Sequence, residues 1–193
     1  MANWGNPVMV ARGVADALDA AGLPYAIGGA LALSYYTPPR ATLDVDINIF
    51  IAVPGEIDKA LACLTECGFE PENLSTLHRM AGEDGQFRGH IDGMRVDVFV
   101  PAIDYYAALE GRRRQVLIAA RPGWILGPED LAVLKMMFFR RKDLADVDIL
   151  VHAQGANLDL AAVRSQLVDL MDDDDERVRE WDAIVAGSTR SDL

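Results

Sequence analysis

Cysteine is scarce in this chain, and long apolar runs are missing. Cys63 and Cys67 are its only cysteines, and their four-residue spacing on an expected helix suits neither a disulfide nor a complete zinc site. We therefore expect two free thiols without a chemical role. No run reaches the ~18 apolar residues of a membrane span, and no basic segment precedes an apolar one at the N-terminus. These absences predict a cytoplasmic protein with no membrane partner.

Basic residues are also few. The chain has 18 Lys and Arg against 30 Asp and Glu, which gives a formal net charge of −12. Such a surface repels phosphate, so a polynucleotide would need a local basic patch. Two segments could supply one, Arg112–Arg114 and Arg140–Lys142. A cationic small molecule would instead be attracted to the acidic surface as a whole.

Length and patterning indicate a globular α/β (α+β) protein with a mixed sheet and a helical C-terminal part. The 193 residues are 51% hydrophobic, enough for one core and a helical appendage. Residues 69–90 show a poor pattern, for which we expect irregular strands, and Arg121-Pro122-Gly123 is expected to link two strands. Apolar periodicity, caps and breakers predict helices at about 7–22, 30–36, 56–67, 103–110, from 128, 143–153, 158–171 and 174–186, and strands at 25–27, 43–53, 87–91, 94–100, 115–120 and 124–126.

The most informative stretch runs from Tyr25 to Phe50. A short strand leads into Gly28-Gly29, and apolar residues then alternate with Asp44, Asp46 and Asn48. A strand of this pattern projects both carboxylates from one face. They would repel each other there, and a divalent cation removes that cost. Since Mg²⁺ is usually held by a couple of carboxylates and phosphate oxygens, and glycines give phosphates close access to the backbone, the stretch favours a metal–nucleotide site.

Two alternatives compete for this motif. Asp-x-Asp can be the solvent-facing side of an ordinary half-exposed strand. The start Asp44-x-Asp46-x-Asn48 also resembles an EF-hand loop, but Ile49 replaces the turn glycine and Gly55 replaces the final glutamate, so that alternative fails. A third acidic residue, Asp97, shares a strand face with Arg95 and Phe99 after the Asp92-Gly93 turn, which suits a site better than a solvent face.

These residues together resemble the polymerase-β-type nucleotidyltransferase superfamily. Its signature is Gly-Gly or Gly-Ser after a strand, Asp-x-Asp on the next strand, and a later third carboxylate. Within it the chain is most similar to small bacterial enzymes related to abortive-infection (type IV toxin–antitoxin) toxins. That similarity depends on Lys135, on Arg140 with Lys142-Asp143, and on Asp146. The resemblance covers roughly residues 24–150. It implies a nucleotidyltransferase α/β core at residues 1–127 and a helical part at residues 128–193 packed on it.

The resemblance also implies a mechanism. A nucleoside triphosphate would be the substrate, and its nucleoside monophosphate would move to an acceptor hydroxyl. Two Mg²⁺ ions, or Mn²⁺, would be held by three catalytic carboxylates: Asp44 and Asp46 bind one ion and share the second with Asp97, which would serve as the base. The triphosphate would be contacted by Gly28, Gly29, Arg40, Thr42 and Lys135, with bracing of the carboxylates as the alternative role of Arg40 and Thr42. Gly29 stands where many relatives have serine. The roles of Asp143 and Asp146 stay open, since either carboxylate can pair with Arg140 or Lys142.

Three functions fit this site. The first is a toxin-like enzyme that modifies RNA, tRNA or a protein and has a cognate antitoxin. The second is an aminoglycoside-type antibiotic nucleotidyltransferase, whose cationic acceptor the acidic surface would attract. The third, from another class, is a module that binds a nucleotide or a partner without turnover. Retention of all three carboxylates argues for activity. The sequence leaves the base preference, the acceptor and the oligomeric state open.

Overall fold

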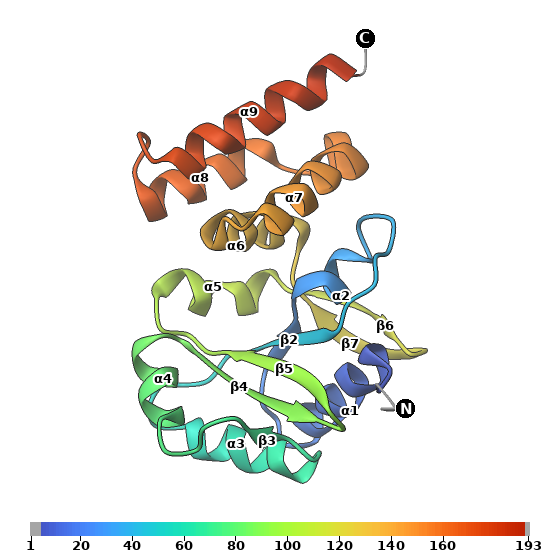
Figure 1. The fold of residues 1–193 in the computed structure, drawn as a ribbon, viewed down its shortest axis with the longest axis vertical. Coiled ribbons are helices and arrows are strands. Elements are labelled where there is room, and N and C mark those ends of the chain that lie inside the picture. The colour runs from blue at the N-terminus through green and yellow to red at the C-terminus, as the bar shows by residue number, and fades with distance from the viewer. Residues whose placement is uncertain (1–4, 192–193) are drawn as a thin grey trace. The chain divides into compact units, whose positions relative to one another are not determined.

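The computed structural model describes residues 5–191 of the chain. The chain folds into two compact units. The first contains the N-terminal segment up to Ala32 and residues Arg40–Leu126, and the second contains Leu33–Pro39 and the chain from Gly127 onward. The seven strands lie in the first unit, and the second is helical (Figure 1).

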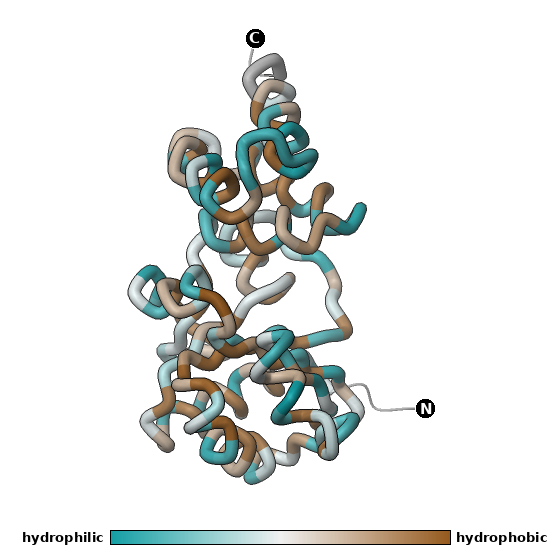
Figure 2. Tube along the Cα trace, turned by 90° about the vertical axis from the view of Figure 1, so that its left-hand side faces the viewer, coloured by the Kyte–Doolittle hydropathy of each residue, from teal (hydrophilic) through white to brown (hydrophobic). Residues whose placement is uncertain are grey.

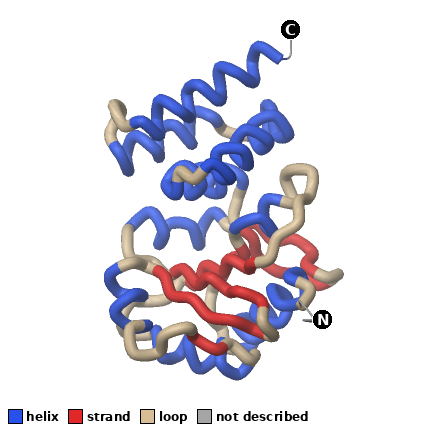
Figure 3. The backbone as a smooth tube through the Cα atoms, viewed as in Figure 1, coloured by secondary structure: helices blue, strands red, loops and turns tan. Residues whose placement is uncertain are grey.

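A mixed sheet forms the centre of the first unit (Figure 3). The strand order is β3-β4-β5-β2-β1-β7-β6. The pairs β2·β5 and β1·β7 are parallel, and the other neighbouring pairs are antiparallel. The predicted α/β fold with a mixed sheet is therefore confirmed. The strands are β1 Tyr25–Ile27, β2 Asp44–Ile49, β3 Glu70–Pro71, β4 Gln86–Ile91, β5 Met94–Phe99, β6 Arg114–Ile118 and β7 Arg121–Ile125.

One face of the central strands is apolar and buried. In β2, Val45, Ile47 and Ile49 have no exposed surface. Helices α1 (Pro7–Ala20) and α3 (Ile57–Glu66) contact each other, and α1 also contacts β2. Helix α1 begins as expected, because Asn6 accepts a hydrogen bond from the Val8 amide and proline occupies the first turn. Burial of this apolar set leaves the alternate residues of β2 on the opposite face.

Two local predictions about the first unit were wrong. Residues 69–90 contain helix α4 (Leu77–Glu83) between β3 and β4, not irregular strands alone. Arg121-Pro122-Gly123 does not link two strands, because it forms the start of β7. The turn is Ala119-Ala120, both with positive φ (48° and 64°). A two-residue hairpin turn of this kind normally carries Asn or Gly, so two alanines gave no turn signal.

The remaining helices are distributed over the two units. Helix α2 (Gly29–Leu33) begins directly after β1, in the first unit, and its last residue, Leu33, belongs to the second unit. Helix α5 (Asp104–Arg112) lies in the first unit. In the second unit, α6 contacts α7 and α8, and α9 contacts α7 and α8. Trp181, Val178, Leu167, Val163 and Leu150 are buried there. The helices of the second unit are α6 Pro128–Phe138, α7 Arg141–Gln154, the 3₁₀ turn Gly155–Asn157, α8 Leu160–Met171 and α9 Glu176–Ser191.

Hydrophilic and hydrophobic residues alternate along the helices of the second unit instead of forming long apolar runs (Figure 2). Across residues 5–191, no helix combines the length and the apolar character that crossing a bilayer requires.

A buried arginine ties α1 to the sheet. Arg12 is only 1% exposed; its Nη1 donates to the Pro122 carbonyl at 2.7 Å, and its Nη2 lies 2.7 Å from Asp16 Oδ1. Arg12→Ala leaves that carbonyl without its donor, so we expect a loss of roughly 3 kcal/mol in the free energy of unfolding. Urea unfolding measures it. Arg79→Ala, which removes an exposed arginine, should leave this free energy nearly unchanged. Equal effects of the two variants would contradict this role.

Candidate functional site

The polar face of the sheet carries an ordered array of charged residues. In the pairing of β2 with β5, Asp46 lies opposite Asp97, and Asp44 lies opposite Arg95. In the pairing of β5 with β4, Arg88 lies opposite Asp97. Registered neighbours share a face of the sheet, so Asp44, Asp46 and Asp97 lie together, as the resemblance implies. Arg88 and Arg95 belong to the same array.

Two guanidinium groups contact these carboxylates. Nη2 of Arg95 lies 2.8 Å from Asp44 Oδ2 and 3.0 Å from Asp97 Oδ2, so one nitrogen joins two carboxylates. Nε of Arg88 donates to Asp97 Oδ1. The hydroxyl of Thr42 donates to Asp44 Oδ1. The three carboxylates and two guanidiniums leave one net negative charge in the array.

The glycine pair lies against Asp46. The Gly28 amide donates to the Asp46 carbonyl at 2.8 Å, and Gly29 has φ +55°. A Cβ atom built on Gly29 would lie 1.7 Å from Asp46 Oδ2. Both the backbone conformation and the lack of space therefore require glycine at residue 29. Glycine and serine both occur at this position in the superfamily that the chain resembles, and the structure favours glycine here.

Asn48 continues the same face of β2 into the interior. The residue is 2% exposed, and its Nδ2 donates to the Ala26 carbonyl at 3.2 Å. Its Oδ1 is buried and has no hydrogen-bond partner among the residues that the structure describes. A Cβ on Gly28 would approach Asn48 Nδ2 to 2.9 Å. The glycine pair thus packs closely on two consecutive polar side chains of β2.

An aromatic pair borders the array. Tyr106 of α5 stacks on Phe99 of β5, with ring centroids 6.4 Å apart and an interplanar angle of 18°. Phe99 follows Arg95 and Asp97 on their face of β5, as the sequence predicts. Burial, and then the negative charge of Asp46, raise the pKa of the Tyr106 hydroxyl to about 12.

The raised pKa of Tyr106 predicts an alkaline loss of stability. A tyrosine ionises near pH 10 when unfolded, so the contribution of neutral Tyr106 is complete below pH 10 and is lost as the pH rises to about 12. That loss amounts to at most roughly 2–3 kcal/mol. Tyr106→Phe should remove it, so urea unfolding at pH 9 and 11.5 should show a smaller decrease for the variant. An equal decrease in both proteins would contradict the assignment.

The other residues that the resemblance assigned to the triphosphate lie in different surroundings. Arg40 is exposed, and its Nη1 donates to the neighbouring Ala41 carbonyl at 3.3 Å. Lys135 belongs to α6 in the second unit and is 6% exposed. Its Nζ lies 2.6 Å from Asp146 Oδ2 and 3.7 Å from Asp143 Oδ1. Asp143 also accepts hydrogen bonds from Arg140. Lys135 is therefore neutralised by carboxylates of its own unit.

Several arginines of the basic segments Arg112–Arg114 and Arg140–Lys142 contact other residues of the chain. Arg113 stacks over the Trp124 ring at 4.5 Å, and Arg112 lies 5.3 Å from the centroid of the Tyr105 ring. Arg140 lies over Phe138 at 4.9 Å in addition to its bonds with Asp143. The aromatic contacts fix these guanidiniums in place and leave their charge unchanged, whereas the charge of Arg140 is offset by Asp143.

Arg88 and Arg95 were missed as members of the site, although the sequence contained the signal. Arg95 was placed on the face of Asp97 without a role. The Asp92-Gly93 turn fixes Ile91 opposite Met94, and counting back three residues on one strand and forward three on the other brings Arg88 opposite Asp97. The register of a two-residue hairpin therefore predicts this ion pair.

The chemistry of the array fits a divalent cation. Three carboxylates project from two adjacent strands beside a glycine turn, and carboxylate oxygens are the ligands that Mg²⁺ prefers. Arg95 already places a cationic group between Asp44 and Asp97. Within residues 5–191, no three His, Cys, Asp or Glu side chains converge as metal ligands in this side-chain arrangement.

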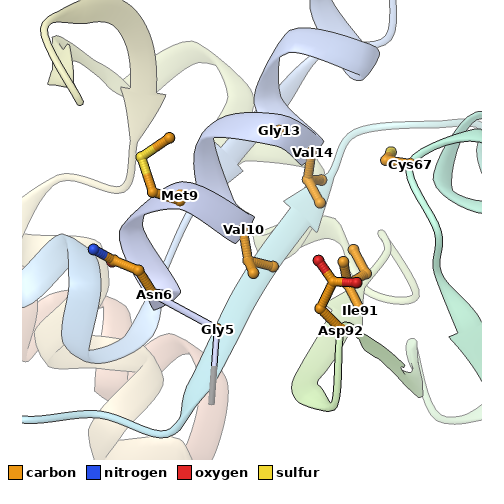
Figure 4. Close-up of a pocket in the computed structure, with 9 residues that line it drawn as sticks. All are labelled: Gly5, Asn6, Met9, Val10, Gly13, Val14, Cys67, Ile91 and Asp92. Carbon is orange, nitrogen blue, oxygen red and sulfur yellow. The ribbon is translucent and has the colours of Figure 1, made fainter. Parts of the chain in front are cut away.

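A separate cavity of about 230 Å³ lies beside α1 (Figure 4). Ile91, which lines it, alternates with His90 and Arg88 along β4, so it points to the face opposite the carboxylates. None of the three carboxylates lines this cavity. The lining residues are Gly5, Asn6, Met9, Val10, Gly13, Val14, Cys67, Ile91 and Asp92.

No family model matches the chain, and no curated protein matches its sequence. Several solved structures are similar to this chain in fold. The antibiotic-resistance factor ANT(2'')-Ia in solution is 17% identical with a TM-score of 0.58, over 96% of this chain and 91% of that one. Its crystal structure with adenylyl-2''-tobramycin is 18% identical with a TM-score of 0.62, over 84% and 97%. An antigenic nucleotidyltransferase-like protein from Paracoccidioides brasiliensis is 18% identical with a TM-score of 0.56, over 90% and 92%. At these identities the likeness establishes one thing: the chain has the α/β nucleotidyltransferase fold.

Proposed function

We propose that this protein is a metal-dependent nucleotidyltransferase that moves a nucleoside monophosphate from a nucleoside triphosphate to an acceptor hydroxyl and releases pyrophosphate. The observation that carries the proposal is the register of β2 with β5, which brings Asp44, Asp46 and Asp97 to one face next to Gly28-Gly29. A fold shared with solved nucleotidyltransferases supports it. A half-exposed solvent face would not require a glycine packed on Asp46.

Each residue of the array has a role in this proposal. Asp44 and Asp46 would hold one Mg²⁺ and share a second with Asp97, and Mn²⁺ could replace Mg²⁺. The ions supply charge neutralisation at the phosphates and activation of the acceptor hydroxyl. Thr42 orients Asp44 through its hydroxyl. Asp97 is the base that takes the acceptor proton.

Backbone groups are assigned to the triphosphate. The Gly28 amide is used by the Asp46 carbonyl, so Gly29 is the glycine whose backbone we assign to the phosphates, while Gly28 permits the close packing. Arg40 is assigned to the same phosphates because it is exposed on the segment that leads into β2. Lys135 remains a candidate triphosphate contact, and its pairing with Asp146 would have to open for that role.

We infer that the acceptor is a cationic small molecule. The net charge of −12 attracts polyamines and aminoglycoside-like compounds and repels polynucleotides. Among similar structures, ANT(2'')-Ia was solved with adenylyl-2''-tobramycin. The toxin-like subgroup, with RNA, tRNA or protein as acceptor and a cognate antitoxin, stays a prediction from the sequence resemblance.

The test of this function is label transfer from each α-³²P-labelled nucleoside triphosphate with Mg²⁺. The acceptors are a panel of aminoglycosides and other polyamines, total tRNA, and a cell extract. Label on a small cationic compound supports the proposal in full. Label that is removed by nuclease or by protease would show that the acceptor is RNA or protein, and the proposed reaction would still stand. Nucleotide binding without any transfer would favour the non-catalytic binding module.

A further inference from the structure

We propose that Arg95 is a built-in competitor for the metal: its guanidinium holds Asp44 and Asp97 together in the metal-free protein, and a divalent ion displaces it toward the triphosphate. This inference rests on the proposed function and adds to it a positioning residue that couples metal loading to substrate binding. It concerns one side chain of β5 and the two carboxylates that it joins.

The contacts of Arg95 are those of a cation between two ligands. A single nitrogen, Nη2, lies 2.8 Å from an oxygen of Asp44 and 3.0 Å from an oxygen of Asp97. These two carboxylates belong to different strands, β2 and β5, which are paired in parallel. They are also the pair that would share a metal ion in the proposed mechanism. A guanidinium and a divalent ion cannot both lie between them.

The guanidinium of Arg95 is imperfectly satisfied where it lies. Its Nε is buried without a hydrogen-bond partner among the described residues. A donor in that state costs free energy that a fully paired guanidinium does not. The side chain as a whole is still 39% exposed, so it can turn outward without breaking into the core. Arg95 can therefore leave the carboxylates at a modest cost.

Arg88 differs from Arg95 in the number of carboxylates that it contacts. It contacts only Asp97, through the other carboxylate oxygen, Oδ1. The hydrogen bond with Asp97 is the main reason why the pKa of Arg88 is raised, and the charges of Glu72 and Asp46 add to it. Arg88 bridges no two ligands, so a metal between Asp44 and Asp97 leaves its position intact. We therefore assign displacement to Arg95 and permanent orientation of Asp97 to Arg88.

Displacement has a consequence for the triphosphate and for the base. A released guanidinium next to a metal–phosphate site is a phosphate ligand, because its fork of N–H donors matches phosphate oxygens. Asp97, the proposed base, exchanges Arg95 for the metal ion and keeps its contact with Arg88. Metal loading thus frees a phosphate contact and leaves Arg88 to orient Asp97.

The experiment measures Mn²⁺ binding by electron paramagnetic resonance, without nucleotide, and then tripolyphosphate binding at saturating Mn²⁺. For Arg95→Met we expect Mn²⁺ to bind about tenfold more tightly, since a competing charge is gone, and tripolyphosphate about tenfold more weakly. Arg95→Lys, which keeps the charge, should bind Mn²⁺ within about threefold of the wild type. Arg79→Met removes an exposed arginine paired with Glu83 and controls for net charge; it should change neither affinity.

The opposite signs of the two effects distinguish displacement from a structural role, which would weaken both affinities. Mn²⁺ affinity of Arg95→Met equal to or below that of the wild type would overturn the inference. The proposed function is tested separately in the same assay by Asp46→Asn. If the wild type binds Mn²⁺ and Asp46→Asn does not, the metal site stands whatever Arg95 does. If neither the wild type nor Arg95→Met binds Mn²⁺, the proposed function fails with the inference.

Discussion

Asp97→Asn is expected to lower the rate of nucleoside monophosphate transfer by roughly 10³-fold, because it removes the base and one metal ligand together. The fold should survive. Asp97 contacts the half-exposed Arg88 and Arg95, and Arg95 keeps its contact with Asp44. Asp44 and Asp46 would still hold one ion, so nucleotide affinity should fall much less than the rate. Steady-state transfer kinetics with the acceptor found in the label assay measure both.

Asp58→Asn is the matched control for this variant. Asp58 lies on α3 with an 86% exposed side chain and contacts only His78 among the ion pairs described. The substitution Asp58→Asn removes the same charge from the same unit, and we expect this variant to transfer the nucleoside monophosphate at the wild-type rate. An Asp97→Asn protein that keeps more than about a tenth of wild-type activity would remove Asp97 from the catalytic residues.

Gly29→Ala is expected to abolish detectable activity and to destabilise the protein by roughly 2–4 kcal/mol. The new Cβ would lie 1.7 Å from Asp46 Oδ2, and φ of +55° disfavours any residue with a side chain. Either the turn or the carboxylate has to move. Either change would separate the backbone that we propose for phosphate binding from the proposed metal ligands. Urea unfolding and the transfer assay report the two parts of this effect.

Gly82→Ala is the corresponding control. Gly82 lies in α4, and beyond its chain neighbours and the backbone of its own helix no atom lies within 4 Å of a Cβ built on it. Alanine favours a helix over glycine, so this variant should be as stable as the wild type or slightly more stable. If Gly29→Ala were also neutral, the packing of the glycine pair on Asp46 would not be a requirement of the site.

The sequence predicted the elements whose signals are local. Asn6 and Pro7 mark the start of α1 because a cap and a fixed φ act within one turn, and Asp92-Gly93 marks the β4–β5 hairpin in the same way. The Ala119-Ala120 turn escaped prediction because its positive φ values are imposed by the pairing of β6 with β7 and not by the residues themselves. Helix α4 was missed since it is short and carries little periodicity.

The acidic residues of the candidate site were predictable from the sequence, but its balance of charge was not. Period-two alternation placed Asp44 with Asp46 and Asp97 with Arg95, each pair on its own strand. Only the parallel register of β2 with β5, which depends on a long crossover, places Asp46 beside Asp97 and Arg95 beside Asp44. The pairing of Lys135 with Asp146, eleven residues later, likewise depends on how α6 and α7 pack.

Mg²⁺-dependent binding of a nucleoside triphosphate to the wild type and to Asp46→Asn tests the central claim most directly. For each triphosphate, isothermal titration gives four affinities: those of the wild type and of Asp46→Asn, each measured with Mg²⁺ and with a chelator. If the three carboxylates form a metal–nucleotide site, the wild type binds a triphosphate only with Mg²⁺, and Asp46→Asn, which alters the ligand packed against Gly29, loses that binding. Metal-dependent binding that persists in Asp46→Asn would contradict the assignment of the site.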